Sequence, residues 1–439
     1  EPDVCKISGR DYVDSVISFD EDGEPHVGDI NEAWPEVYRE FKLDIGRSGS
    51  LGGLSDGWPT SKTPLNLTTL LMQYVKGSLD RQSVEKAKNP PVVVTVPAGW
   101  SPNQRRDTQL AVMAADFGDV MLIDEPSSAI LHYATVQQKL ASGELALVFD
   151  FGGGTLDTCV VEYCPKAKVP IQVLGAECVE LGGRHMDNLI ASYLMGLFEH
   201  NHKTTLDPED SIEGRVQREI LRQLSRAAKE RLSGACELKG DGARHLVNRM
   251  NFVDDKGLYE WVDYGTLRGI IKPVLDRIVE PVSAVLKRVN LDKRRLSQAI
   301  LVGGSSLIPD VRVRLQDYLE VPCVIAKDPM TAVAKGAALY HREIMKSLPG
   351  IRPVNKIADD GYGVVISRDG RRENDLFVKQ SQELPVQVWK EYATVEEGAQ
   401  IRLECVRGTS SDIRDCETLG VKVITLERPV PAGTEVDIE

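Results

Sequence analysis

Residues 145–161 read LALVFDFGGGTLDTCVV, two apolar segments joined by a glycine-rich turn. Runs rich in Val and Leu are typical of strands that are covered on both faces. We therefore predict two strands folded back on each other around Gly152, Gly153 and Gly154. Consecutive glycines let the backbone approach a bound group closely, and their N–H groups can converge on phosphate oxygens. The alternative is an ordinary hairpin with a flexible tip, and this segment alone does not choose between the two.

Carboxylates stand beside this turn and after a second predicted strand. Asp150 and Asp157 flank the glycines, where they could hold Mg²⁺ directly or through water. Glu125 follows the predicted strand 120–123, and ligands of open α/β sheets sit at the carboxyl ends of strands. We interpret Glu125 as a candidate for orienting water, with capping of the next helix as the alternative. Lys42 lies between apolar neighbours, a pattern that by itself is more often a surface lysine than a catalytic one.

Length and composition limit the classes of function. The 439 residues, 42% hydrophobic and 27% charged, are enough for two or three domains with sizeable cores. A net charge of −13 argues against a nucleic-acid partner, because a phosphate footprint needs a basic face. No apolar run is long enough to span a membrane, and the N-terminus has no signal-peptide pattern. The eight cysteines form no Cys-x-x-Cys pair, so we expect mainly buried free thiols and a cytoplasmic protein.

The first part of the chain alternates strands and helices. We predict a hairpin over 12–28, irregular structure over 30–64, and a helix over 65–87. A strand follows at 91–97. Ser101-Pro102-Asn103-Gln104 then opens a helix with a capping box, and that helix runs to about Phe117.

The second part repeats the strand–glycine–helix pattern. We predict a helix that follows Asp187 and runs to about residue 200, a second helix over 207–233, a strand pair over 246–262, and one amphipathic helix over 263–289. In Gln298–Pro309 a second glycine turn ends a strand and opens a helix, so it could cover a nucleotide from the other side. Asp328-Pro329 caps a last helix, in which Gly336 allows close packing against a neighbour. From about residue 351 strands alternate with turns, which indicates a separate all-β domain.

Taken together, these stretches resemble the actin-like ATPase fold, and specifically the seventy-kilodalton heat-shock chaperone family. The resemblance is ordered along nearly the whole chain, and five weak motifs in the right order are strong. The matching segments are Val94–Ala98 with Gln104-Arg105, Asp124–Ala129, Phe149–Asp157, Leu181–Gly183 and Leu301–Pro309.

The family implies an α/β, two-lobed, ribonuclease-H-like ATPase fold followed by a smaller, incomplete β-sandwich. We expect the nucleotide-binding domain at 1–347, with upper subdomains at about 12–88 and 185–264. A linker is expected at 348–356. The β domain, at 357–439, resembles the front of a peptide-binding domain, most clearly at Leu419–Val421 and Glu435–Glu439.

The resemblance also implies a role for each candidate residue. Gly152, Gly153, Gly154 and Thr155 would cradle the β- and γ-phosphates of ATP or ADP. Asp150 and Asp157 would act on Mg²⁺ and the attacking water, and Glu125 would help to position both. Lys42 would neutralise charge that develops on the transferred phosphoryl group. The residues that would line the nucleoside are Gly182, Gly183, Lys229, Ser233, Gly303, Gly304 and Ser305.

These roles predict an ATP-binding chaperone whose nucleotide state is coupled to the binding of extended apolar peptides, with possible co-chaperones. Unfolded or extended peptides would be its clients. The alternative is a catalytically weak or inactive nucleotide-binding regulator of the same fold. A third candidate, a sugar kinase, is opposed by the β domain and the Gly-Gly-Gly-Thr-Leu-Asp turn.

The sequence also departs from the family. No Asp-Leu-Gly-Thr-Thr phosphate loop precedes Tyr12, so we expect a natural start to be missing and hydrolysis by this chain to be poor or absent. Leu307 and Glu230 stand where basic residues are common, and Arg226 stands where an acidic one is usual. The polar linker offers only Ile357 where the family carries several leucines, so coupling through it is expected to be weak or differently built.

Overall fold

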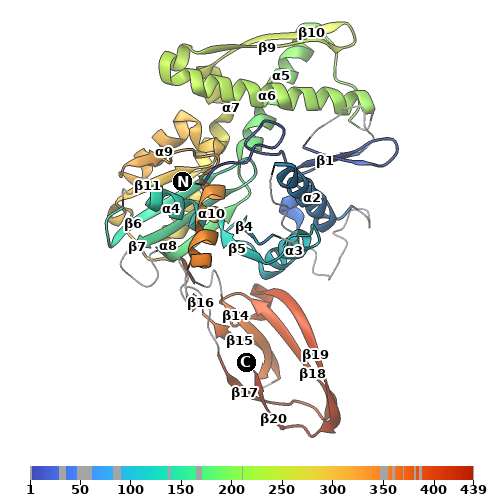
Figure 1. The fold of residues 1–439 in the computed structure, drawn as a ribbon, viewed down its shortest axis with the longest axis vertical. Helices are drawn as coiled ribbons and strands as arrows, with labels where there is room; N and C mark the ends of the chain where they lie inside the picture. The colour runs from blue at the N-terminus through green and yellow to red at the C-terminus, as the bar shows by residue number, and fades with distance from the viewer. Residues whose placement is uncertain are drawn as a thin grey trace.

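The computed structural model shows an α/β part with a β part beneath it (Figure 1). Part of the predicted linker and turns lies outside the described residues, as do Gly52, Gly53, Gly57, segment 83–87 and Glu439, and those predictions stay open. The described residues are 2–28, 36–46, 62–82, 90–136, 140–164, 171–209, 211–346, 354–357, 361–368, 370–379, 382–384 and 388–438.

The main sheet contains the predicted glycine hairpin, which the structure confirms. Strands β6 and β7 pair antiparallel along their whole length, and β8 continues the antiparallel pairing on the far side of β7. On the other side, β11 and β12 run parallel to β6, and the sheet order is β12-β11-β6-β7-β8-β13-β16. The strands are β6 (Glu144–Phe151), β7 (Leu156–Tyr163), β8 (Ile171–Val179), β11 (Gln298–Val302), β12 (Cys323–Ile325), β13 (Val354–Ile357) and β16 (Glu383–Leu384).

Both faces of this sheet are covered, which explains the continuous apolar runs. Along β6, Leu147 and Phe149 belong to one core, whereas Ala146 and Val148 belong to the core on the opposite face. The second core includes α4 (Glu125–Val136) and α10 (Ala332–Lys346). A Cβ placed on Gly336 would lie 1.8 Å from the carbonyl oxygen of Ser128, so the predicted close helix packing is confirmed.

The N-terminal elements form a small three-stranded sheet with a helix beside it. The predicted hairpin is present, with shorter strands than expected, as β1 (Val16–Phe19) and β2 (Pro25–Val27). The prediction of irregular structure over 30–64 is wrong at β3 (Glu36–Arg39) and α1 (Phe41–Asp44), because β3 pairs with β1 from a distance. Helix α2 (Pro64–Gln82) starts where the apolar stripe predicts.

Strands β4 (Val92–Val96) and β5 (Val120–Asp124) pair in parallel, and α3 (Pro102–Met113) connects them. The capping box at Ser101 and Gln104 is confirmed, with both reciprocal bonds present. Helix α3 ends about four residues before the predicted Phe117, because Asp116 adopts a left-handed conformation (φ 61°).

The upper second lobe contains α5 (Gly183–His202), α6 (Ile212–Lys239) and the hairpin of β9 (Arg244–Val253) with β10 (Lys256–Asp263). Three predictions for this lobe are wrong. Helix α5 begins at Gly183, before the predicted start after Asp187, because its first amides are held by the carbonyls of Gly152 and Gly153. Helix α6 begins after Ser211 and continues past Gly234, because Ala235 and Cys236 carry the apolar stripe onward against the core. The predicted single helix over 263–289 is two helices. Pro281 has no backbone N–H to donate a hydrogen bond to the carbonyl of residue 277, and its ring clashes with that carbonyl. The two are α7 (Tyr264–Arg277) and α8 (Val279–Arg288).

After β11 the chain forms a one-turn helix η3 (Gly304–Leu307) and then α9 (Pro309–Leu319), as predicted. The C-terminal region is all-β within the described residues. Its larger sheet has the order β15-β14-β18-β19, and β17 pairs with β20. The strands are β14 (Tyr362–Arg368), β15 (Arg371–Val378), β17 (Lys390–Ala393), β18 (Gly398–Arg407), β19 (Glu417–Val430) and β20 (Glu435–Ile438).

The eight cysteines are free thiols; Cys159 and Cys323 are buried, whereas Cys5 and Cys405 are exposed. Among the described residues, no helix combines the length and the apolar character needed to cross a membrane.

Candidate functional site

The glycine turn places two carboxylates face to face. Asp150 and Asp157 are direct partners in the β6–β7 register, and the turn of residues 152–155 joins the two strands. The amide of Gly152 donates to the carbonyl of Thr155 (N···O 3.0 Å), which closes the turn. A Cβ on Gly153 or Gly154 would meet nothing within 4 Å, so this stretch of backbone is open to a ligand.

The N-terminus of α5 supports the turn from behind. The amides of Gly183 and Arg184 donate to the carbonyls of Gly152 (3.0 Å) and Gly153 (2.9 Å). A Cβ on Gly182 would lie 2.3 Å from the Gly153 oxygen, so only glycine fits there without displacing the turn. The positive end of a 20-residue helix therefore lies beside the open glycines, an arrangement that favours anions.

The second glycine turn also contacts the first. Gly303 has φ 82°, and a Cβ on it would lie 2.4 Å from the carbonyl oxygen of Phe151 and 2.6 Å from Oδ1 of Asp150. The hydroxyl of Ser305 donates to the carbonyl of Gly152 (2.8 Å). A Cβ on Gly304 would lie 3.9 Å from Cγ of Met330, an ordinary contact distance. Two predicted glycine motifs that are about 150 residues apart in the chain thus form one surface.

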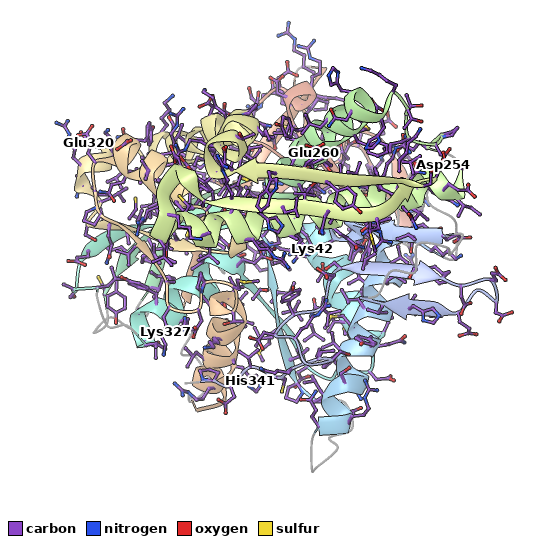
Figure 2. All side chains as sticks on the ribbon, turned by 90° about the horizontal axis from the view of Figure 1, so that it is seen from above. Lys42, Asp254, Glu260, Glu320, Lys327 and His341 are labelled. Carbon is purple, nitrogen blue, oxygen red and sulfur yellow. The ribbon has the colours of Figure 1, made fainter. Side chains whose placement is uncertain are left out.

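Lys42 reaches the same place from α1. Its Nζ donates to Oε1 of Glu125 at 2.7 Å and lies 5.6 Å from the centre of the Trp100 ring. The Lys42 side chain is 44% exposed, so it is accessible to solvent. Figure 2 shows Lys42 near the middle of the molecule, between the blue N-terminal elements and the yellow-green elements. Burial lowers the pKa of Lys42, but the carboxylates of Glu125, Asp157 and Asp150 outweigh it, so the pKa lies above its ordinary value.

The carboxylates hold more negative charge than Lys42 neutralises. Burial, with Glu125 as the next cause, raises the pKa of Asp157 to about 7. The same two causes, and the charge of Asp157, raise the pKa of Asp150 well above its ordinary value. Oδ1 of Asp157 accepts from the amide of Ala98 (3.2 Å), whereas Oδ2 is buried and has no hydrogen-bond partner among the described residues. This surplus of buried oxygen ligands fits a hard divalent cation such as Mg²⁺.

Glu125 is the first residue of α4, directly after β5. The N-cap position therefore falls on Asp124, which is paired with Arg105 at 2.6 Å. Of the two alternatives for Glu125, helix capping does not fit this geometry. Its carboxylate is 12% exposed and turned to Lys42.

The residues predicted to line a nucleoside gather at the start of α5. Lys229 is 7% exposed; its Nζ donates to the carbonyl of Gly183 (3.1 Å) and pairs with Asp187 (2.7 Å). Ser233 lies one helical turn further on and is 5% exposed, and its hydroxyl has no partner among the described residues. Lys229, Gly183 and Ser305 thus adjoin the Gly152–Gly154 turn.

The unusual residues at this end occupy distinct places. Leu307 is 43% exposed. Arg226 donates to both Glu230 and Asp14, each at 3.0 Å, so it ties the N-terminal segment to α6. Two more ion pairs link the N-terminal elements to the second lobe, namely Arg39–Glu219 at 2.6 Å and Arg184–Glu40.

The sequence did not identify three further residues that border the site. Trp100 lies under Lys42, Asp187 pairs with Lys229, and Cys178 is the register partner of Asp157 across β7 and β8. Each of these residues lies far along the chain from its partner, so its position in the sequence carries no chemical signal by itself. Cys178 could have been found only by predicting β8 and its register.

The chain is similar in sequence to a known protein family and to several of its members. A family model described as "Hsp70 protein" matches residues 59–439. Chaperone protein DnaK of Thermoplasma volcanium is 26% identical over 84% of this chain and 58% of its own length. DnaK of Methanothermobacter thermautotrophicus is 28% identical over 74% of this chain and 52% of its own, and DnaK of Halobacterium salinarum is 26% identical over 99% and 66%. The chain therefore spans between about half and two thirds of the length of these relatives.

Proposed function

Because the chain belongs to the Hsp70 family and has its two-lobed actin-like ATPase fold with a β domain, we propose that it binds ATP or ADP with Mg²⁺ in the cleft between the lobes. One observation carries the proposal. The open backbone of Gly153 and Gly154, the N-terminus of α5, and the cluster of Lys42 with three carboxylates all converge on the same point.

Each residue would act on the nucleotide by position and charge. The amides of residues 152–155 would hold the β- and γ-phosphates, with Thr155 at the end of the turn. Lys42 would stabilise the negative charge that develops on the transferred phosphoryl group, since its raised pKa keeps it protonated. Asp157 and Glu125 would orient the attacking water, with Asp157 able to take up its proton near neutral pH.

The metal site would be built from the same carboxylates. Asp150 and Glu125 would hold Mg²⁺, mainly through water, and their buried oxygens suit that ion. Mg²⁺ would neutralise phosphate charge and orient the phosphate chain. The nucleoside would lie along Gly182, Gly183, Lys229, Ser233 and the Gly303–Ser305 turn. With Leu307 and Glu230 in place of basic residues, we expect weaker hold on the base.

For the β part we propose binding of extended apolar peptides, as in unfolded clients. Support comes from exposed apolar side chains on an antiparallel scaffold, since Val421, Val423 and Ile424 of β19 are 40–50% exposed. In Figure 1 β18 and β19 stand together at the side of the lower part. Co-chaperone partners and a cytoplasmic location belong to the same proposal.

Coupling between the two parts has a continuous route. The segment Val354–Ile357, at the predicted junction of linker and β domain, forms strand β13, which pairs with Ile171 and Gln172 at one end of β8 and with β16 on its other side. The opposite end of β8 lies beside Asp157. Nucleotide-dependent movement of this sheet could thus reach the β part. The domain limits 1–347, 348–356 and 357–439 remain part of the proposal.

Two measurements test the proposal. Calorimetry of Mg–ATP and Mg–ADP should show one site per chain, and a phosphate-release assay should report turnover. Absence of binding contradicts the proposal. Binding without turnover selects the second candidate, a regulatory nucleotide binder, which is favoured by the direct Lys42–Glu125 ion pair that a catalytic lysine would have to give up.

A further inference from the structure

Cys178 lies on β8 beside Asp157, the most buried carboxylate of the site. It is the register partner of Asp157 across β7 and β8, so the two side chains lie next to each other on the same face of the sheet. The close approach of Gly99 makes room for it, because a Cβ on Gly99 would lie 2.9 Å from the Cβ of Cys178. Cys178 is only partly buried, so part of its side chain is accessible to solvent.

A second, independent observation marks this place as a ligand site. Asp157 is 1% exposed, and its Oδ2 has no hydrogen-bond partner among the described residues. A buried carboxylate oxygen without a partner costs free energy that a cation would recover. The field of Glu125 and Asp150 adds to the attraction, since Lys42 offsets only one of these charges.

We propose that Cys178 and Asp157 together bind a soft divalent cation of the zinc class in the nucleotide-free cleft. Thiolate and carboxylate are both ligands of Zn²⁺, and a sulfur ligand shifts preference from Mg²⁺ toward softer ions. Within the described ranges, no three His, Cys, Asp or Glu side chains are grouped to hold a metal. The ion would therefore complete its coordination with water.

Binding releases one proton. The metal replaces the hydrogen on Cys178 Sγ, which forms a metal–sulfur bond, and the proton goes to solvent. Burial and the charge of Asp157 raise the pKa of the free thiol, so the thiol stays protonated until a metal displaces the proton. The negative field that retains a proton attracts a doubly charged ion more strongly.

The chain offers a matched control in Cys236 of α6. That thiol also lies near carboxylates, Asp310 and Asp241, but Arg268 pairs with both of them (2.6 and 2.7 Å). The proposal thus predicts metal binding at Cys178 and none of comparable strength at Cys236.

The test titrates the reduced, nucleotide-free chain with Cd²⁺ and follows the ultraviolet charge-transfer absorption of cadmium–thiolate bonds. We expect a band that saturates at one equivalent, is lost in Cys178→Ser, is kept in Cys236→Ser, and is weakened at least tenfold in Asp157→Asn. No saturable band, or a band that Cys178→Ser retains, overturns the proposal. Cadmium NMR of the unaltered chain covers the case of a variant that does not fold, and only a resonance typical of one sulfur among oxygens supports the site.

The cadmium band is measured without nucleotide, so it does not depend on the proposed function. A second titration, adding Mg–ATP to the cadmium-loaded chain, rests on that function. Displacement of Cd²⁺ places both ligands in one cleft, whereas unchanged cadmium absorption during demonstrated ATP binding overturns the placement of the site at the phosphate loop.

Discussion

Two glycines of the site should respond in opposite ways to the addition of one methyl group. Gly303→Ala introduces a Cβ at 2.4 Å from the Phe151 carbonyl oxygen and 2.6 Å from Asp150 Oδ1, at a residue with φ 82°. Gly153→Ala introduces a Cβ with nothing within 4 Å. The first change should damage the fold, and the second should damage only the approach of a ligand.

The expected magnitudes follow from the structure. The left-handed conformation costs an alanine about 1–2 kcal/mol. Forcing an atom into a filled site costs about 1–3 kcal/mol more. We therefore expect Gly303→Ala to lower the free energy of unfolding by about 2–5 kcal/mol. Gly153→Ala should change it by no more than about 0.5 kcal/mol, as an open surface substitution does, yet reduce Mg–ATP affinity at least about tenfold, or ~1.4 kcal/mol.

The assay is urea unfolding of the nucleotide-free chain, followed by tryptophan fluorescence, to which buried Trp100 beside Lys42 contributes, together with calorimetric titration of Mg–ATP. The unaltered chain is the reference for both. If Gly303→Ala unfolds at the same urea concentration as the reference, the contact between the two glycine turns is not as described. If Gly153→Ala binds Mg–ATP with unchanged affinity, the open turn is not where phosphate lies.

Three further predictions concern the charge cluster and the core. Lys42→Ala should reduce any measured ATP turnover by at least about 10²-fold while far-ultraviolet circular dichroism stays unchanged; unchanged phosphate release would remove Lys42 from the mechanism. In the presence of a metal chelator, Asp157 has a pKa of about 7 in the folded chain, against about 4 in the unfolded chain. The folded chain therefore keeps a proton that the unfolded chain has lost, and the stability that this group contributes falls as the pH rises from about 4 to about 7. Between pH 5 and pH 8 the unaltered chain should lose about 3 kcal/mol of stability from this group, and Asp157→Asn should remove that loss in urea unfolding; an identical pH slope in both proteins would refute the assignment. Gly336→Ala should lower the unfolding free energy by about 2–4 kcal/mol, because its Cβ would meet the Ser128 carbonyl at 1.8 Å; a neutral result would contradict the α4–α10 packing.

Local chemistry made part of the fold predictable. The capping box at Ser101 and the hairpin around Gly152–Gly154 depend on residues that are close in sequence, and both are present as predicted. The break between α7 and α8 also depends on a local feature, because Pro281 has no N–H to donate a hydrogen bond to the carbonyl of residue 277. The sequence interpretation followed the amphipathic stripe and missed the proline.

Other elements depend on partners far along the chain. Strand β3 forms against β1, and β8 forms against β7, so their weak patterns were not recognised. Gly234 suggested a helix end, but the apolar contacts of Ala235 and Cys236 extend α6 to Lys239. Tertiary packing overrides local propensity at each of these places.

The candidate site shows the same division. Motif spacing and family resemblance identified the glycine turns, Lys42 and the carboxylates, and the fold brings them together. The partners that adjust them came only from the structure. Asp187 beside Lys229 and Cys178 beside Asp157 are set by helix contact and strand register, which no short motif encodes.

The central claim is that the Gly152–Thr155 turn is the phosphate loop of a nucleotide cleft. The most direct test is calorimetric titration of the 439-residue chain with Mg–ATP, with Gly153→Ala in parallel. The account predicts saturable binding at one site per chain, weakened at least about tenfold by the added methyl group. Saturable binding that Gly153→Ala leaves intact, or no binding by the folded chain, would contradict it.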